Sequence, residues 1–358
     1  MTEASESSCG LHQSVNNDSQ GENPGSCKGE RNPKDSRKPG TAMPAVRRVL
    51  KLEYVDGILV PPISFNRDTL IDALRYQARE GDIFLATYPK TGATWTQYIL
   101  WILLNLEKGK ALPPFIEIVT SLAPFLELVG RDAIERLPEP RIIKHHLPFS
   151  RSPYHPKAKY VVIVRNPFDC VVSFYHHCLG DRLNMDMRAD TTFDEFFEDF
   201  MDGHVPFGEY FEHILSWYAH RNDPNVFFFY YEELREHQTQ GILKLAEFID
   251  KSLAERLHKD EGLLKDVVQR TTFENMKANV TIDADVHKTE HSEETDDPSA
   301  FIPLKNFFRK GRVGDWRSYF NKDQEQRLRS VYERRMQGTE MWDVWKEYLG
   351  YDEDVTPL

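Results

Sequence analysis

Three short segments of this sequence place cationic side chains beside glycine or hydroxyl residues, a combination suited to binding phosphate or other anionic groups. The first segment, residues 87–95, reads Thr-Tyr-Pro-Lys-Thr-Gly-Ala-Thr-Trp. It follows the apolar run Ile83–Ala86 and leads into a second apolar run, Thr94–Leu106, so the pattern predicts a buried strand, a turn and a core helix. A helix N-terminus offers free N–H groups and a positive dipole, and Lys90 would add a full charge to them.

The same turn departs from the Walker A motif of nucleotide-binding proteins. That motif places its lysine directly after a glycine, whereas Lys90 precedes Gly92 by two positions. Gly92 gives the turn conformational freedom, and we expect Thr94 to cap the helix. Taken alone, the segment is explained equally well by a structural turn that binds nothing.

The second segment follows the continuous apolar run Tyr160–Val164, which is typical of a strand buried on both faces. Arg165 ends that strand, Pro167 suits the first turn of a following helix, and Ser173 lies about two turns further on. An arginine fork and a hydroxyl can together hold a phosphate. The alternative is a structural ion pair between Arg165 and Asp169, since such pairs are common.

The third segment, residues 309–316, reads Arg-Lys-Gly-Arg-Val-Gly-Asp-Trp and is basic in an otherwise acidic chain of net charge −12. Glycine lets the backbone approach a ligand closely, so the segment suits a second anionic group. An exposed basic turn is the alternative. The acidic balance of the chain disfavours general binding of nucleic acid and favours a small anion over a long polyanion.

Together and in this order, the segments resemble those of the cytosolic sulfotransferases, which transfer a sulfuryl group from 3′-phosphoadenosine 5′-phosphosulfate (PAPS) to a hydroxyl or an amine. The family's 5′-phosphosulfate loop is similar to Tyr-Pro-Lys-Ser-Gly-Thr-Thr-Trp, and residues 88–95 depart from it at Thr91 and Ala93. Residues 309–316 match the family's Arg-Lys-Gly-x-x-Gly-Asp-Trp at every defined position. The resemblance extends over about Leu52–Trp345.

The resemblance implies how PAPS would be bound. The residues expected to hold the 5′-phosphosulfate, the 3′-phosphate and the adenine are Lys90, Thr91, Gly92, Ala93, Thr94, Trp95, Arg165, Ser173, Tyr231, Thr271, Phe273, Phe308, Arg309, Lys310 and Gly311. Ala93 lacks the hydroxyl of the family's threonine, so we expect weaker donor binding rather than none.

Residues 141–148 read Arg-Ile-Ile-Lys-His-His-Leu-Pro, where the family shows Lys-Thr-His-Leu-Pro. The resemblance therefore implies a catalytic base at His146, and it leaves His145 in the position of the family's threonine. Histidine suits the removal of a phenolic or alcoholic proton, because its pKa of about 6.5 lies near neutral pH. Composition alone cannot choose among 13 histidines, and His145 is the next candidate.

The expected reaction is an in-line displacement at sulfur. Lys90 would stabilise the leaving group, and Lys144 would neutralise the equatorial sulfuryl oxygens. These lysines fill the role that magnesium plays in many phosphoryl transfers, so we expect no metal. Cys170 and Cys178 lie eight residues apart in one predicted helix, which is too far for a disulfide.

Strand-like and helix-like segments alternate over Lys51–Tyr351, which predicts an α/β fold. We expect a single domain with a central parallel sheet flanked by helices and a P-loop-like 5′-phosphosulfate loop. Residues 1–45 have the composition of a disordered polar tail, so the sulfotransferase domain would span residues 46–358. No signal peptide and no long apolar run is visible, so we expect a cytoplasmic protein that makes no contact with a membrane.

The acceptor is expected to be a small molecule such as a phenol, a monoamine or a steroid. Acidic residues near the pocket would favour an amine-bearing phenol, but the sequence does not show which acidic residues lie there. The helical spacing of Phe193, Phe196, Phe197 and Phe200 predicts core packing rather than ligand contact.

The family's dimerisation segment resembles Lys-x-x-x-Thr-Val-x-x-x-Glu, and residues 317–326 depart from it at Asn321, Lys322 and Gln326. We therefore expect a monomer or a weak homodimer. Two rival classes of protein remain. A nucleotide kinase or other phosphoryl transferase would need the missing Walker lysine. A non-catalytic sensor of PAPS, or of its product 3′,5′-adenosine bisphosphate (PAP), would have no need of His146.

Overall fold

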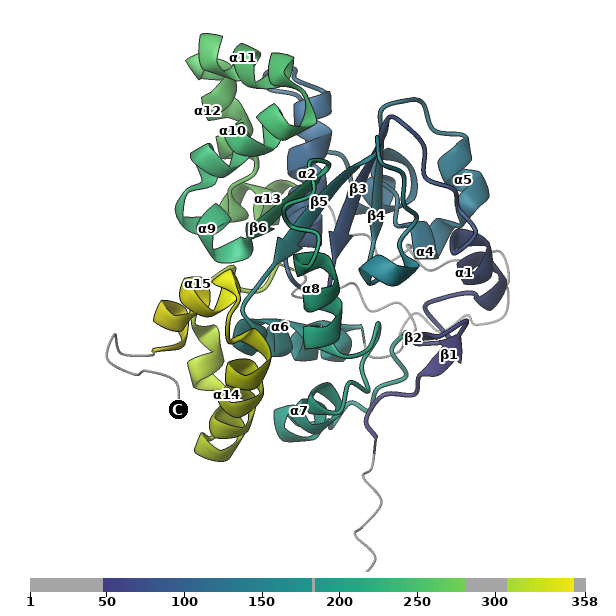
Figure 1. Cartoon of the computed structure of the whole chain (residues 1–358), viewed down its shortest axis with the longest axis vertical. Helices are drawn as coiled ribbons and strands as arrows, with labels where there is room; N and C mark the ends of the chain where they lie inside the picture. The colour runs from purple at the N-terminus through teal and green to yellow at the C-terminus, as the bar shows by residue number, and fades with distance from the viewer. Residues whose placement is uncertain (1–47, 182–183, 281–307, 351–358) are drawn as a thin grey trace, which may run out of the picture. The chain divides into compact units, whose positions relative to one another are not determined.

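The structure of the protein is a computed structural model that describes residues 48–181, 184–280 and 308–350. The predicted polar tail, residues 1–45, lies outside the described residues. Strands and helices alternate along the described part of the chain (Figure 1). None of the helices described there is both long enough and apolar enough to cross a membrane.

A four-stranded parallel sheet forms the centre, with its strands in the order β4–β3–β5–β6. The strands are β3 (Asp82–Thr87), β4 (Arg141–His145), β5 (Lys159–Val164) and β6 (Val226–Tyr230). An antiparallel pair, β1 (Glu53–Val55) and β2 (Ile58–Val60), precedes this sheet in the chain. The two strands predicted from the apolar runs are confirmed as the cores of β3 and β5.

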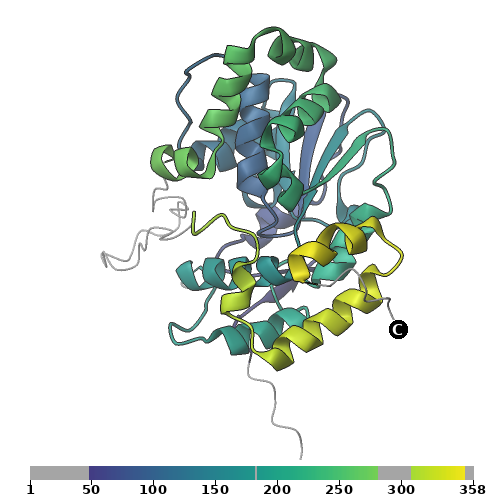
Figure 2. The ribbon, with the colours of Figure 1, turned by 90° about the vertical axis from the view of Figure 1, so that its left-hand side faces the viewer.

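Helices connect the strands and cover both faces of the sheet. In chain order they are α1 (Arg67–Ala73), α2 (Ala93–Leu104), α3 (Phe115–Glu117), a π-helical turn (Ile118–Leu122), α4 (Leu126–Val129), α5 (Arg131–Glu135), a 3-10 turn (Phe149–Arg151), α6 (Pro167–Gly180), α7 (Phe193–Met201), α8 (Tyr210–Tyr218), α9 (Tyr231–Glu236), α10 (Gln238–Ile249), α11 (Lys251–Lys259), α12 (Glu261–Arg270), α13 (Phe273–Asn279), a second 3-10 turn (Asp315–Ser318), α14 (Lys322–Met336) and α15 (Glu340–Leu349). Helices α10 to α12 lie together at the top of Figure 1, and α14 lies near α6 and α7 at the bottom; the view in Figure 2 agrees.

Alternate residues of the central strands face two separate hydrophobic cores. Phe84 and Ala86 of β3 pack in one core with side chains of α6, α7, α8 and α14. Ile83 and Leu85 pack in the other core with α2, α10 and α12. A parallel sheet buried on both faces in this way is the expected α/β architecture, and the four phenylalanines of α7 belong to the first core as predicted.

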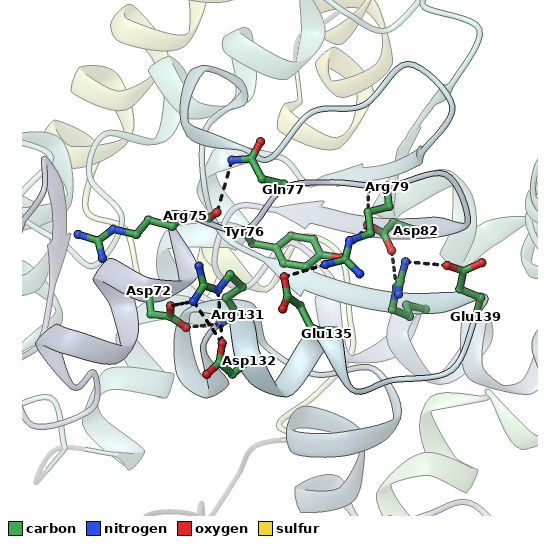
Figure 3. A network of polar contacts seen from close by, with 11 residues as sticks. Asp72, Arg75, Tyr76, Gln77, Arg79, Asp82, Arg131, Asp132, Glu135 and Glu139 are labelled. Carbon is green, nitrogen blue, oxygen red and sulfur yellow. Dashed lines mark hydrogen bonds and ion pairs between the residues drawn. The ribbon is translucent and has the colours of Figure 1, made fainter.

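A polar network closes the amino ends of β3 and β4 (Figure 3). Asp82 lies opposite Arg141 in the strand register, and its carboxylate accepts a hydrogen bond from Arg141 Nε at 2.6 Å. The Tyr76 hydroxyl and the Arg79 N–H each donate to the same carboxylate at 2.8 Å. Because a buried ion pair is tolerated only when its remaining hydrogen-bonding groups are satisfied, this network fixes where both strands begin.

The helices that leave the carboxyl ends of β5 and β3 begin in different ways. Helix α6 has a capping bond from the Asp169 N–H to the Asn166 side chain, and Pro167 occupies its first turn as predicted. Helix α2 is preceded by Gly92, and no side chain caps it. The prediction that Thr94 caps this helix is therefore wrong, because the positive φ of Gly92 lets the chain enter the helix before Thr94 is reached.

The two cysteines of α6 are both buried and both free. The prediction that Cys170 and Cys178 form no disulfide with each other is confirmed.

Candidate functional site

A cavity lies at the carboxyl ends of β3, β4 and β5, where the three cationic segments come together. Parallel sheets commonly bind ligands at this edge. All but two of the residues predicted to bind the donor or to catalyse the reaction line the cavity: Lys90, Gly92, Ala93, Thr94, Trp95, Lys144, His146, Arg165, Ser173, Tyr231, Phe273, Phe308, Arg309, Lys310 and Gly311. The two exceptions are Thr91 and Thr271.

Both exceptions are buried beside the cavity rather than in its wall. The hydroxyl of Thr91 donates to the carbonyl of Tyr88 at 2.8 Å, within the turn itself. The hydroxyl of Thr271 lies 2.9 Å from the carbonyl of Val267, and the Thr271 carbonyl accepts a hydrogen bond from Trp95 Nε1 at 2.7 Å. Thr271 therefore orients the ring that faces the cavity instead of facing it directly.

The turn after β3 has a backbone geometry that only glycine allows at one position and a helix start that no side chain caps. Gly92 has φ of 120°, and a Cβ placed there would lie 2.9 Å from Ile163 Cδ1 and 3.0 Å from the Tyr231 ring, so only glycine fits. Since no side chain caps α2, its first N–H groups are open to a ligand at the residues that line the cavity. Lys90 also has a positive φ, of 70°, a conformation that non-glycine residues adopt mainly at functional turns.

The electrostatics of Lys90 fit the same role. Burial lowers the pKa of this lysine to about 8, and the nearby charges of Arg165 and Arg309 act in the same direction. A cation whose charged form is disfavoured in the free protein gains the most from an incoming anion.

The end of β4 places Lys144 and His146 on the same side of the strand, because alternate residues face the same way. Lys144 Nζ lies 3.6 Å from the centre of the Phe125 ring. His146 Nδ1 lies 2.7 Å from the main-chain carbonyl oxygen of Thr87. Nδ1 also lies 2.9 Å from the Thr87 hydroxyl, which can donate or accept. A carbonyl only accepts hydrogen bonds, so both contacts are satisfied when Nδ1 carries the proton and Nε2 is the basic nitrogen.

The surroundings of His146 keep its imidazole neutral. Burial and the charge of Lys144 hold its pKa well below the usual 6.5. The rings of Phe125 and Phe207 pack against the imidazole at 4.9 and 5.0 Å between ring centres. A neutral imidazole with a defined basic nitrogen is the form that a general base requires.

His145 faces the opposite side of β4 and does not line the cavity. Its Nδ1 accepts a hydrogen bond from the Leu147 N–H at 3.2 Å, and its Nε2 lies 3.0 Å from the Ser152 hydroxyl. Burial lowers its pKa to about 3. Both ring nitrogens are occupied within the fold, so His145 has a structural environment.

Arg165 makes no ion pair with Asp169 in the described part of the chain. The alternative that these two residues form a structural ion pair is therefore wrong. The Arg165 guanidinium lies 3.4 Å from the carbonyl oxygen of Lys90 and 4.5 Å from the centre of the Tyr231 ring. The Asp169 carboxylate instead accepts the main-chain N–H groups of Gly314 and Trp316, at 2.7 and 3.1 Å. Asp169 thus holds the third cationic segment against α6.

The third segment presents its cations together. Arg309 and Lys310 both pair with Asp315, and the Lys310 contact is 2.7 Å. A Cβ on Gly311 would lie 2.4 Å from the Phe273 ring, so this glycine permits the close packing of the segment on α13. Lys310 and Arg312 are exposed and Arg309 is half-buried, so the segment is a basic turn at the surface that also lines the cavity.

The sequence analysis missed several residues of the cavity wall. They are Ser64, Phe65, Val119, Leu128, His177, Asp181, Met185, Arg235 and Met276. Most of them lie in separate segments and share no spacing. A signal was present for two, because His177 and Asp181 follow Ser173 at intervals of four residues, which places all three on one face of a helix.

Comparison with known proteins agrees with this geometry. Residues 80–340 match the sulfotransferase domain. The chain is 35% identical over 277 residues to sulfotransferase 1B1 of Mus musculus, covering 74% of this chain and 85% of that protein. It is 31% identical over 280 residues to the amine sulfotransferase of Oryctolagus cuniculus, covering 75% and 85%. The crystal structure of mouse sulfotransferase SULT7A1 complexed with PAP superposes with a TM-score of 0.64 at 28% identity, covering 84% of this chain and 99% of that one.

The fold is an α/β domain with a cavity at the carboxyl edge of its parallel sheet, lined by the turn after β3. The sequence match over most of the chain makes the identification specific: the chain belongs to the sulfotransferase family and is a transferase of that type.

Proposed function

We propose that this enzyme transfers the sulfuryl group of PAPS to a small acceptor by in-line displacement, with His146 as the base. The observation that carries the proposal is the bond between His146 Nδ1 and the Thr87 carbonyl. It leaves Nε2 as the basic nitrogen in a cavity whose wall also contains Lys90 and Lys144.

The donor would lie across the three segments. The turn at Lys90–Thr94 and the start of α2 suit the 5′-phosphosulfate, and Arg165, Ser173 and Arg309–Gly311 suit the 3′-phosphate. Trp95 would stack on the adenine beside Tyr231. The likeness to SULT7A1, which was crystallised with PAP, supports PAPS as donor.

In the reaction, the acceptor oxygen forms a bond to sulfur as the bond between sulfur and the bridging phosphate oxygen breaks. His146 Nε2 takes the acceptor proton, and PAP leaves with the electron pair of the broken bond. Lys90 would meet the negative charge on the bridging oxygen, and Lys144 the charge on the sulfuryl oxygens. Among the residues that the structure describes, no group of three His, Cys, Asp or Glu side chains is arranged to hold a metal ion. That no metal takes part stays a prediction.

The part of the cavity wall that would surround the acceptor favours an amine-bearing phenol as the acceptor. Apolar side chains form much of that part, including Phe65, Phe125 and Met185, which suits an aromatic ring. Asp181 is the single carboxylate among the described residues of the wall, and a carboxylate favours a ligand with an ammonium group. The match to an amine sulfotransferase is consistent with this choice.

The test is transfer from ³⁵S-labelled PAPS to a panel of phenols, catecholamines and steroids by the wild type, His146→Ala and Asp181→Asn. We expect transfer by the wild type, almost none by His146→Ala, and a selective loss of amine acceptors in Asp181→Asn. Equal losses for neutral phenols would remove Asp181 from amine selection. PAP binding without transfer to any acceptor would favour the non-catalytic sensor.

The oligomeric state and the cytoplasmic location stay predictions. Asn321 and Gln324 form a capping box at the start of α14. Residues 317–326, which depart from the family's dimerisation segment, therefore include the cap of this helix. We expect a monomer or a weak homodimer in light scattering after size-exclusion chromatography, and a stable dimer would contradict this prediction.

A further inference from the structure

The buried carboxylate of Glu127 contacts the main chain of the proposed base, His146. Glu127 is in α4, and its side chain is fully buried. Its Oε1 accepts the main-chain N–H of His146 at 2.6 Å. Its Oε2 is also buried and has no hydrogen-bond partner among the described residues. A buried charge with an unsatisfied oxygen destabilises a protein unless a nearby charge compensates it.

The segment that carries Glu127 also contacts Lys144. Phe125 precedes α4 and pairs with Lys144 in an isolated parallel bridge. The Lys144 N–H donates to the Pro124 carbonyl at 2.8 Å, and its ammonium lies over the Phe125 ring. Residues 124–127 therefore position both functional side chains at the end of β4.

The opposite charges of Glu127 and Lys144 influence each other. Burial raises the pKa of Glu127, and the Lys144 charge and the His146 N–H oppose that rise. Burial lowers the pKa of Lys144, the charge of Glu127 opposes that fall, and Lys90 adds to it. The Glu127 carboxylate on α4 thus favours the charged form of Lys144, and the Lys90 ammonium on the turn after β3 disfavours it.

We propose that Glu127 is a positioning residue for sulfuryl transfer, which fixes the main chain of His146 and supplies the buried negative charge that keeps a proton on Lys144 Nζ. Without that charge, a desolvated Lys144 beside Lys90 would lose its proton more readily and could not neutralise sulfuryl oxygens. The inference rests on the proposed function, because the role of Lys144 does.

Two substitutions separate the charge from the hydrogen bond. Glu127→Gln keeps the size and a carbonyl acceptor for the His146 N–H but removes the charge. Glu127→Asp keeps the charge but shortens the side chain. Glu117→Gln is the matched control, since Glu117 is exposed at the end of α3. The thermal midpoint of each variant shows whether it is folded.

We expect Glu127→Gln to lower kcat at neutral pH by about tenfold or more, while the Kd of PAP changes by less than about threefold. The alkaline limb of the kcat profile should move about one unit to lower pH, because Lys144 loses its proton earlier. Glu127→Asp should lower kcat without moving that limb. The change to Gln should add little to the loss caused by Lys144→Met, since both act through one ammonium group.

A wild-type kcat and pH profile in Glu127→Gln would overturn the proposal. So would equal profiles for the Gln and Asp variants, or fully additive losses with Lys144→Met. A second measurement does not need activity: the pH dependence of Lys144 acetylation by acetic anhydride, read by peptide mass spectrometry in the unliganded protein. It should shift to lower pH in Glu127→Gln and not in Glu117→Gln. An inactive wild type that shows this shift would reject the proposed function and retain the charge coupling.

Discussion

The same two strands carry buried charge at both ends, in opposite arrangements. At the amino ends of β3 and β4, Asp82 and Arg141 form an ion pair of 2.6 Å, and Tyr76 completes the set (Figure 3). At the carboxyl ends, Lys144 has an aromatic ring below its ammonium and is desolvated, so its pKa falls. The first arrangement pairs its charges in direct contact, whereas Lys144 makes no ion pair within the described part of the chain and, by the proposed function, meets its anionic partner on the ligand.

The difference separates stability from function. Removing one member of a satisfied buried pair leaves an uncompensated charge, which mainly destabilises the folded state. Removing a desolvated cation from a cavity takes away an interaction that is made only when an anion binds, so it mainly affects binding or turnover. The four predictions below test this separation, from the largest expected effect to the smallest.

The largest effect is expected for the base. His146→Ala should lower kcat by about 10²–10⁴-fold, the usual contribution of a general base, with little change in the Kd of PAP. His145→Ala is the matched control, since His145 is next to His146 in the chain but faces the fold rather than the cavity. His145→Ala should lower the thermal midpoint, while the kcat of the folded fraction should stay close to that of the wild type. Equal kcat losses in both variants would contradict the assignment of the base.

The second effect is on stability at the amino ends. Asp82→Asn removes the carboxylate under Arg141 and should lower the free energy of unfolding by about 3–5 kcal/mol. The measurement is urea unfolding, with Asp72→Asn as control because the Asp72–Arg131 pair is partly exposed. An exposed pair contributes only about 0–1 kcal/mol. A folded Asp82→Asn variant should keep its kcat, and a large loss of kcat would break the comparison.

The third effect is on turnover at the carboxyl ends. Lys144→Met removes the cation but retains much of the apolar stem that packs on Phe125. Its kcat should fall by an amount equivalent to about 2.7–4 kcal/mol. Its unfolding free energy should fall by less than that of Asp82→Asn, because the buried Glu127 carboxyl, whose pKa burial already raises, can take up a proton once Lys144 is gone. Lys157→Met, which removes an exposed lysine paired with Glu80, should change neither quantity appreciably. A destabilisation as large as that of Asp82→Asn would show that Lys144 has a structural role.

The smallest effect concerns pH. The pKa of Lys90 is lowered to about 8 in the free protein, and a bound phosphate would raise it again by favouring the charged form. Binding therefore takes up a proton above that pH, and the affinity for PAP should fall by up to about tenfold per pH unit. Titration calorimetry in buffers of different ionisation enthalpy measures this uptake. In Lys90→Met the affinity should be weaker, and the proton uptake assigned to this lysine should be absent.

Sequence reasoning worked where the signal is local. The apolar runs before Lys90 and Arg165 are strands, because continuous burial leaves a continuous apolar pattern. It failed where the neighbour is distant in the chain. Asp169 does not pair with Arg165, four residues away, but with N–H groups about 145 residues further on. A strong local candidate for an ion pair was thus displaced by a tertiary contact.

The two neighbouring histidines at the end of β4 can be told apart from the sequence. Alternation along β4 puts Lys144 and His146 on one face and His145 on the other, so a strand ending at residues 144–146 already separates the two histidines. Which face borders the cavity still depends on the turn after β3, and only the folded chain brings that turn beside β4.

The sequence by itself determined the three cationic segments, the two strands before them and the family resemblance, because each depends on residues that are close in the chain. The tertiary structure decided which of those residues share one cavity, that Asp181 lines it, that His146 Nδ1 lies against the Thr87 carbonyl, and that Glu127 accepts the His146 N–H. These features depend on distances between separate elements and on desolvation. Both arise only when the helices cover the sheet and exclude water from the ends of its strands.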